Sequence, residues 1–157
     1  MTEKTCTFVV THAEGDSAVV RDVETAQVHT LSSNPGLETR DVVAATIAPD
    51  PPLEVTWNVV DVEQRRRVEI VDSDLEPTGQ EKALAADAEV GDLIRQERAG
   101  TGEIHVLAVP SERIEEAAGD VIEDDETIAR AARLEAVRVE VRRSIDDGVL
   151  SVRYLPD

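Results

Sequence analysis

The first residues whose types and spacing could do chemistry are the glycines of Gly100-Thr101-Gly102 and the histidine that follows them, His105. A glycine pair can cradle a phosphate when it follows a strand and opens a helix, because the phosphate then meets the free N–H groups of the helix N-terminus. Here the order is reversed, since a predicted helix (89–99) precedes the glycines and a predicted strand (102–110) follows them. We therefore predict that Gly100 ends a helix and that the stretch is a turn.

His105 could act as a general base if a carboxylate oriented it and a nucleophile lay beside it. Glu103 shares its side of the strand by alternation, but no serine or cysteine is close in the sequence. The neighbours Ile104 and Val106 indicate a buried strand. We predict that His105 is a buried, hydrogen-bonded side chain without a catalytic role.

A second set, His12, Glu14 and Asp16, occupies alternate positions and could hold a divalent metal. A hairpin tip at Glu14-Gly15-Asp16 explains the same residues without a ligand, so no metal or cofactor is predicted. His29 alternates with apolar residues and is expected to be structural. Cys6 shares a strand face with Phe8 and is expected to belong to the core.

The basic cluster of the chain is Arg65, Arg66 and Arg67. Arginines at a hairpin tip could bind phosphates while Trp57, on the preceding strand, stacks on a base. Pairing of the arginines with neighbouring acids such as Glu63 and Glu69 is the competing interpretation. The sequence keeps both open, and nucleic-acid binding is the alternative function that we carry forward.

The charge of the chain is strongly one-sided. It has 34 acidic and 16 basic residues, a formal net charge of -18, and only two lysines, Lys4 and Lys82. In molar salt the Debye length falls to about 3 Å, so dense surface carboxylates stop repelling one another over useful distances. This composition indicates a protein of a salt-accumulating cytoplasm.

Nothing in the sequence predicts another location. The N-terminal residues lack the basic and apolar regions of a secretory signal. No apolar run approaches the roughly 18 residues that a membrane helix needs. Cys6 is the single cysteine, which excludes an internal disulfide. A soluble, cytoplasmic protein without membrane contact is expected.

The first half of the chain alternates with period two in short, β-branched segments that are separated by turn residues. The segments are 5–12, 17–22, 27–32, 41–48, 53–63 and 67–73. Strands joined by such short connections must pair mostly antiparallel. We predict a small antiparallel β-barrel, SH3-like or OB-like, over residues 1–73.

The pattern changes after residue 73. Pro77 and Gly79 mark a linker over 74–88. A small α+β sandwich, with helices on one face of a mixed sheet, is predicted over 89–157. Helical spacing over 112–123 predicts a helix capped by Ser111, and a second helix follows over 126–136, capped by Asp124 or Asp125. These helices join strands 102–110 and 137–143, which can therefore run parallel. A final antiparallel strand covers 149–156.

The chain also resembles a family of short acidic proteins of halophilic archaea that has no assigned function. The resemblance is carried by the segments "VHTLSSNPG", "PPLEVTW", "ERAGTGEIHVLAVP" and "LSVRYLPD". It implies a salt-adapted cytoplasmic protein and supplies no catalytic residues. We predict a non-catalytic binding or adaptor protein with a macromolecular partner. RNA binding through the first domain is the alternative, and a small hydrolase or metal-dependent enzyme is the third hypothesis.

Overall fold

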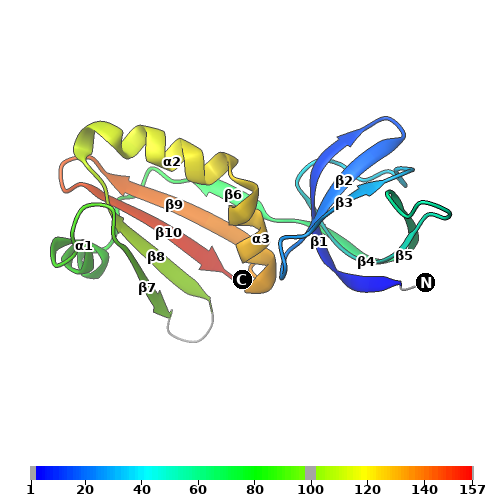
Figure 1. Cartoon of the computed structure of the whole chain (residues 1–157). Helices are drawn as coiled ribbons and strands as arrows, with labels where there is room; N and C mark the ends of the chain where they lie inside the picture. The colour runs from blue at the N-terminus through cyan, green and yellow to red at the C-terminus, as the bar shows by residue number, and fades with distance from the viewer. Residues whose placement is uncertain (1–2, 98–101, 157) are drawn as a thin grey trace. The chain divides into compact units, whose positions relative to one another are not determined.

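The structure, a computed structural model, describes residues 3–97 and 102–156. In that part of the chain the protein is α+β, with two five-stranded mixed sheets and three α-helices (Figure 1). The strands are β1 (Lys4–Glu14), β2 (Ser17–Asp22), β3 (Val28–Leu31), β4 (Asp41–Pro49), β5 (Trp57–Arg67), β6 (Glu69–Asp72), β7 (Leu93–Glu97), β8 (Glu103–Ala108), β9 (Arg138–Ser144) and β10 (Val149–Leu155). The helices are α1 (Gly79–Ala86), α2 (Ile114–Glu123) and α3 (Asp125–Arg133).

The chain divides into two compact units, each built around one sheet. The first comprises Met1–Val68 with Ile128–Arg133, and the second comprises Glu69–Thr127 with Leu134–Asp157. None of the helices in residues 3–97 and 102–156 has the length and apolar character needed to cross a bilayer.

The first sheet closes on itself into a ring with the strand order β1-β2-β3-β5-β4. Its neighbours pair antiparallel, as predicted, except that β3 and β5 are parallel where Leu31 lies opposite Trp57. The predicted strand over 67–73 is not part of this ring. As β6 it pairs in parallel with β9 of the second sheet, because period-two alternation identifies a strand but does not say which neighbour it joins.

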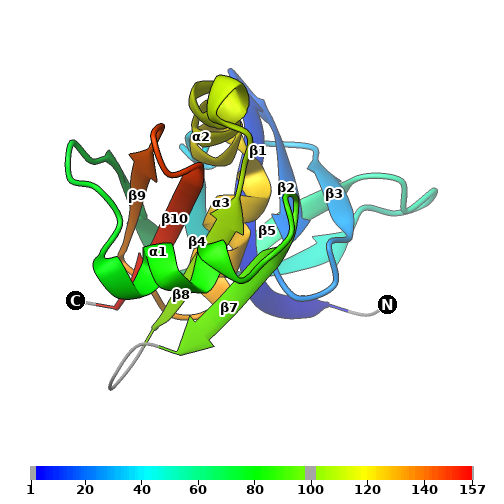
Figure 2. The same ribbon diagram turned by 90° about the vertical axis from the view of Figure 1, so that its left-hand side faces the viewer.

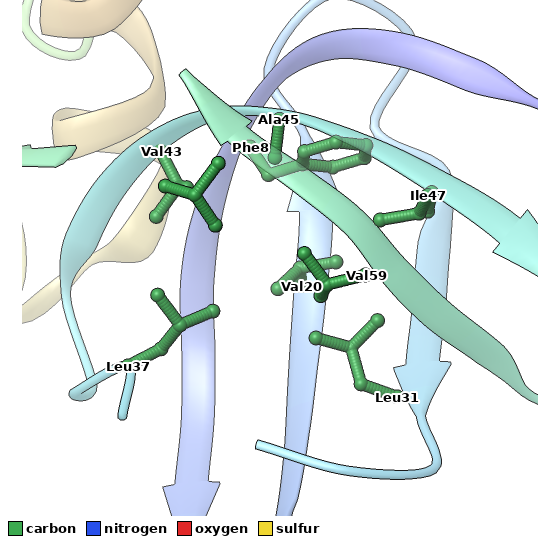
Figure 3. A pocket seen from close by; sticks show the side chains of 9 residues that line it. Phe8, Val20, Leu31, Leu37, Val43, Ala45, Ile47 and Val59 are labelled. Carbon is green, nitrogen blue, oxygen red and sulfur yellow. The ribbon is translucent and has the colours of Figure 1, made fainter. Parts of the chain in front are cut away.

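The inside of the ring is filled by apolar side chains. The buried cluster consists of Phe8, Val10, Ala18, Val20, Leu31, Leu37, Val43, Ala45 and Ile47. Figure 3 shows most of these side chains, together with Val59 of β5, around a small cavity. The volume of this cavity is about 10 Å³. That volume is about one water molecule, and an apolar lining keeps such a space dry. The ring therefore encloses a packed core, against which Cys6 packs as a partly buried residue.

The second sheet has the order β6-β9-β10-β8-β7. Both β8 and β9 run antiparallel to β10, so they are parallel to each other with β10 between them. The prediction that strands 102–110 and 137–143 run parallel is confirmed, and the C-terminal strand is inserted between them. The sheet is mixed, as predicted, because β6 joins β9 in parallel.

Helices lie on both faces of this second sheet, so the prediction of helices on one face is wrong (Figure 2). Ala85 of α1 packs against Val106, Ala108 and Val149. On the other face, Glu115 of α2 reaches Arg143, which lies opposite Leu150. Neighbouring residues of a strand point to opposite faces, so α1 and α2 cover different sides of the sheet.

Several local predictions need correction. The helix predicted over 89–99 is wrong for the residues that the structure describes, 89–97: Leu93–Glu97 is strand β7, whose pairing with β8 outweighs a weak helical pattern. Ser111 caps no helix, because it starts a short 3₁₀ turn and its hydroxyl donates to the Ile145 carbonyl. Asp124 does cap α3, since its carboxylate accepts from the Glu126 N–H. The predicted linker contains α1, which begins after the capping residue Thr78.

The glycine stretch 100–102 lies partly outside the described residues, because only Gly102 is described. Since 93–97 is a strand, the prediction that a helix leads into Gly100 is wrong. Gly102 has φ +92°, and a Cβ there would stand 2.4 Å from the Tyr154 carbonyl oxygen. This glycine permits a close approach of two backbone segments beside β8.

Replacing Gly102 by alanine should lower the free energy of unfolding by about 2–3 kcal/mol, because strain in the left-handed region adds to the clash with Tyr154. The matched control is Gly119→Ala in α2, where an added Cβ meets nothing within 4 Å and helix propensity should stabilise by about 1 kcal/mol. Denaturant unfolding of both variants in molar salt measures the difference. Equal stability of the two variants would contradict the close approach.

Candidate functional site

The residues predicted to bind nucleic acid lie at opposite ends of β5. Trp57 begins the strand and Arg65, Arg66 and Arg67 end it. Arg65 lies eight positions after Trp57, a distance of about 26 Å along the backbone of the strand. The structure therefore does not bring the indole and the guanidinium groups together around one base.

The side chains of Arg65 and Arg67 contact residues 38–41, at and just before the start of β4. Arg65 Nε lies 2.7 Å from Asp41 Oδ2, and Asp41 is buried. Arg67 Nη2 donates to the Thr39 carbonyl at 2.6 Å, and its Nη1 lies 3.4 Å from Glu38 Oε2. The competing interpretation named Glu63 and Glu69 as partners, whereas the structure shows Asp41 and Glu38. These pairs attach the end of β5 to residues 38–41.

The weak metal-binding candidates His12, Glu14 and Asp16 lie on an exposed hairpin. His12 Nε2 lies 3.5 Å from Glu14 Oε2, and both side chains are mostly in solvent. Asp16 lies in the turn beside Gly15, which has φ +56°. Within residues 3–97 and 102–156, no three His, Cys, Asp or Glu side chains are grouped so that they could hold a metal ion.

His105 is buried on β8, as predicted. Its Nε2 lies 3.0 Å from Glu103 Oε2, so the carboxylate expected on the same face is its partner. The imidazole also packs against the Tyr154 ring, with the ring centres 5.0 Å apart. These contacts give the side chain a structural role in the second sheet.

A buried ionic cluster in the first unit is the feature that the sequence did not predict. Lys4 Nζ lies 2.8 Å from Asp22 Oδ2 and 3.1 Å from His29 Nε2. Asp22 Oδ1 accepts from the backbone N–H groups of Glu24 and Thr25, at 2.8 and 3.3 Å. Because an ammonium group can only donate, His29 Nε2 is the acceptor and this imidazole is neutral.

Aromatic and thiol side chains surround this cluster. The His29 ring meets Trp57 edge-on, with ring centres 4.6 Å apart, and it contacts Phe8 on another side. The Cys6 thiol donates to Asp22 Oδ2 at 3.5 Å. Trp57 is thus part of the packing around His29.

The electrostatics of the cluster follow from these contacts. Burial raises the pKa of Asp22, but the hydrogen bonds from Lys4 and from the Glu24 and Thr25 backbone outweigh it, so the pKa lies well below its ordinary value. Burial and the nearby Lys4 charge lower the pKa of His29. Burial, reinforced by Asp22, raises the pKa of Cys6 to about 12.

The chemistry available to the cluster is limited by these states. A thiol that is protonated at neutral pH is a poor nucleophile, and Cys6 donates to Asp22 rather than to His29. Asp22 accepts bonds at both oxygens, so its polar atoms are satisfied. The cluster is therefore a structural ion pair that joins β1 to the ends of β2 and β3.

The exposed part of the first unit has a second notable feature, an apolar segment that we call the apolar strip. It consists of Leu53 and Val55 in the loop before β5 and of Val60 and Val62 on β5 itself. Beyond Trp57, the residues of β5 pair only with residues of β4. Extra residues in β5 at two points interrupt that ladder. Leu53, Val55 and Val60 are the most exposed of the four, whereas Val62 also lines the cavity inside the ring. Beyond Trp57, no pairing of the other edge of β5 is found in the described part of the chain.

Residues 4–143 match a family of unknown function, DUF5812. The chain belongs to this family. No curated protein and no solved structure matches the chain. The region shared with DUF5812 contains the Lys4–Asp22–His29 cluster, the apolar strip, strands β1 to β8 and β9 up to Arg143.

One signal in the DUF5812 sequence could have revealed the ionic cluster. The chain has two lysines, and each one makes close ion pairs. Lys4 pairs with Asp22, and Lys82 Nζ lies 3.0 Å from Glu76 and 3.1 Å from Asp147. On a surface that disfavours lysine, each remaining lysine marks a specific contact.

Proposed function

We propose that this protein is a non-catalytic binding protein of a salt-adapted cytoplasm, and that it contacts a partner protein through the apolar strip. The observation that carries the proposal is the exposure of Leu53, Val55 and Val60. Exposed apolar residues that form a patch mark protein interaction sites, whereas isolated ones do not, and the proposal takes these three, which lie within eight residues of one another in the sequence, as one patch. As the finer description of the ring we propose a small barrel of the SH3-like or OB-like kind.

A protein partner suits the strip better than a nucleic acid does. Arg65 and Arg67 already have carboxylate partners, and phosphate groups would have to replace Asp41 and Glu38. In molar salt the counterion release that drives phosphate binding is also largely lost. Apolar contact, by contrast, persists in salt.

The non-catalytic part of the proposal is supported by the state of the first unit's Cys, His and Asp side chains. In a nucleophilic site the histidine would take a proton from the thiol. Here His29 accepts from Lys4, and the Cys6 thiol faces Asp22. Salt adaptation is supported by the net charge of -18 and by the scarcity of lysine.

The test is a variant that removes apolar surface from the strip. We expect Leu53→Ser, Val55→Ser and Val60→Ser together to weaken capture of the partner from a molar-salt lysate of the native cells by about tenfold or more, as loss of interface anchors does. These positions are 53–78% exposed, so stability should change little. The readout is quantitative mass spectrometry of the proteins retained on the tagged chain.

The matched control carries three serine substitutions on the second unit, at Leu75, Val90 and Ile145, which are 49–68% exposed. Retention of the same proteins by all three forms would refute the strip as the contact surface. The nucleic-acid alternative has its own readout, because Trp57 is the single tryptophan. Salt-sensitive quenching of its fluorescence by single-stranded RNA would favour that alternative.

A further inference from the structure

Helix α1 buries a carboxylate that has no hydrogen-bond partner. The helix packs over β8 and β10 of the second sheet (Figure 2), and Glu81 in its first turn is 3% exposed. Both carboxylate oxygens of Glu81 are buried without a hydrogen bond. A buried polar group in this state costs about 1–3 kcal/mol, and more when it is charged.

Strand β10 supplies two more unpartnered groups. Ser151 is fully buried and its Oγ makes no hydrogen bond. Arg153 lies two residues further along the strand, on the same face, and its Nε is also buried and unpartnered. Glu81 Oε1 stands 3.9 Å from this Nε, which is too far for a hydrogen bond.

The rest of the Arg153 guanidinium is held in place. Its Nη1 donates to Glu140 Oε1 at 3.4 Å, and Glu140 lies opposite Arg153 in the register of β9 and β10. Arg142 also contacts Glu140. The guanidinium is thus fixed from one side, while the Nε edge faces Glu81 across a gap.

This arrangement differs from the Asp22 cluster of the first unit. Asp22 accepts from Lys4 and from two backbone N–H groups, so its burial is compensated. The Glu81 carboxylate lies near the Arg153 guanidinium but does not form a hydrogen bond with it. The other attachments of α1 include the packing of Ala85 and of the partly buried Leu84 against the sheet, and the ion pairs of Lys82. Ion pairs near the surface contribute little to stability.

We propose that Arg153 and Ser151 form a binding site for a carboxylate group, and that Glu81 occupies this site as an internal substitute for the ligand. The Nε edge of a guanidinium binds a carboxylate side-on, and a serine hydroxyl can donate a further bond. A ligand free of the geometry of α1 can approach Arg153 more closely than Glu81 does. Arg142 and Arg153 share Glu140, so these three side chains carry a single net positive charge, which favours a singly charged carboxylate over a phosphate dianion.

Removing the internal carboxylate should expose the site. In Glu81→Ala, we expect acetate to shift the NMR resonance of the Arg153 side-chain Nε–H with an apparent affinity about tenfold or more above wild type, because no competing carboxylate remains. Chloride is exchanged for acetate at constant ionic strength, so that screening does not change. Adding Arg153→Met to this variant should abolish the saturable response of the remaining resonances of β10.

The matched control is Glu115→Ala, which removes a carboxylate from Arg143, an arginine that hydrogen-bonds to both Glu115 and Asp72. An equal acetate response of Arg143 in that variant would show general arginine affinity and would overturn the proposal. If Glu81→Ala does not fold, the isosteric Glu81→Gln is titrated instead, and no response of its Arg153 resonance beyond wild type overturns the proposal as well.

The source of the carboxylate is decided by a second titration of the same variant. One arm uses acetate, and the other uses a Gly-Glu-Gly peptide with both ends blocked. Tighter binding of acetate assigns the site to small free carboxylates, whereas tighter binding of the peptide assigns it to an acidic segment. The apolar strip plays no part in either arm, so failure here leaves the proposed function untouched.

Discussion

The melting temperature of this protein should rise by at least about 10 °C between roughly 0.01 M and 1 M potassium chloride, which corresponds to about 2 kcal/mol for units of this size. The reason is the excess of 34 acidic over 16 basic residues. At the lower salt concentration the Debye length is about 30 Å, so carboxylates across a whole unit repel one another. At the higher concentration that repulsion is screened while burial of the core persists.

The ion pairs of the structure strengthen this expectation. Several of the basic side chains are committed to specific acids, among them Lys4, Lys82, Arg65, Arg67, Arg142, Arg143 and Arg153. These basic side chains neutralise particular carboxylates, and the excess of acidic over basic residues leaves many other carboxylates without a compensating positive charge. The cores of both units rely on valine, alanine and leucine, whose individual contributions to burial are modest.

A change of pH separates charge repulsion from other effects of salt. At low salt, lowering the pH from 7 to about 5 should raise the melting temperature, because protonation of carboxylates removes part of the same negative charge. In molar salt the same change should have little effect, since the repulsion is already screened. Circular dichroism over both series gives the answer. A melting temperature that is independent of salt would refute the salt-adapted interpretation.

The strands of the first half could be predicted from the sequence because local alternation and turn residues determine them. The sheet that a strand joins could not be predicted in this way. Strand β6 is the example, because its pairing with β9 connects residues far apart in the chain. The segment 93–97 has only weak local preference, so pairing with β8 decides its structure.

The two buried clusters are harder still to predict. Lys4, Asp22 and His29 come together only when three strands form the ring, and Glu81 meets Arg153 across 72 positions of sequence. Charged residues are normally exposed, so their types alone predict a solvated surface. The scarcity of lysine is the one sequence signal that indicates a specific contact of Lys4, and it does not identify the partners of Lys4.

The Asp22 cluster leads to the second large expected effect. Asp22→Ala should lower the free energy of unfolding by about 3 kcal/mol, because it leaves Lys4 without its charge partner and two backbone N–H groups without an acceptor. Asp22→Asn should cost less, since an amide oxygen can still accept from the Glu24 and Thr25 backbone. Glu24→Ala is the matched control, as it removes the same charge from an exposed neighbour.

Salt distinguishes this effect from the surface repulsion. The Lys4–Asp22 pair is largely buried, so the loss caused by Asp22→Ala should persist in molar potassium chloride. Glu24→Ala should stabilise slightly at low salt, by reducing negative charge, and should be neutral at high salt. A loss for Asp22→Ala that disappears in molar salt would show that the pair acts as a surface contact.

The pH dependence of this contribution has a definite sign. The pKa of Asp22 is lower in the folded protein than in the unfolded chain, so the unfolded state binds a proton more readily as the pH falls. The contribution is fully present above the unfolded pKa of about 4 and is lost as the pH falls further toward the folded value. In molar salt, urea unfolding of the wild type should therefore show stability decreasing below about pH 4, and Asp22→Asn should show a smaller decrease. Parallel pH profiles of the two proteins would mean that other carboxylates control acid unfolding and that the Lys4–Asp22 pair does not.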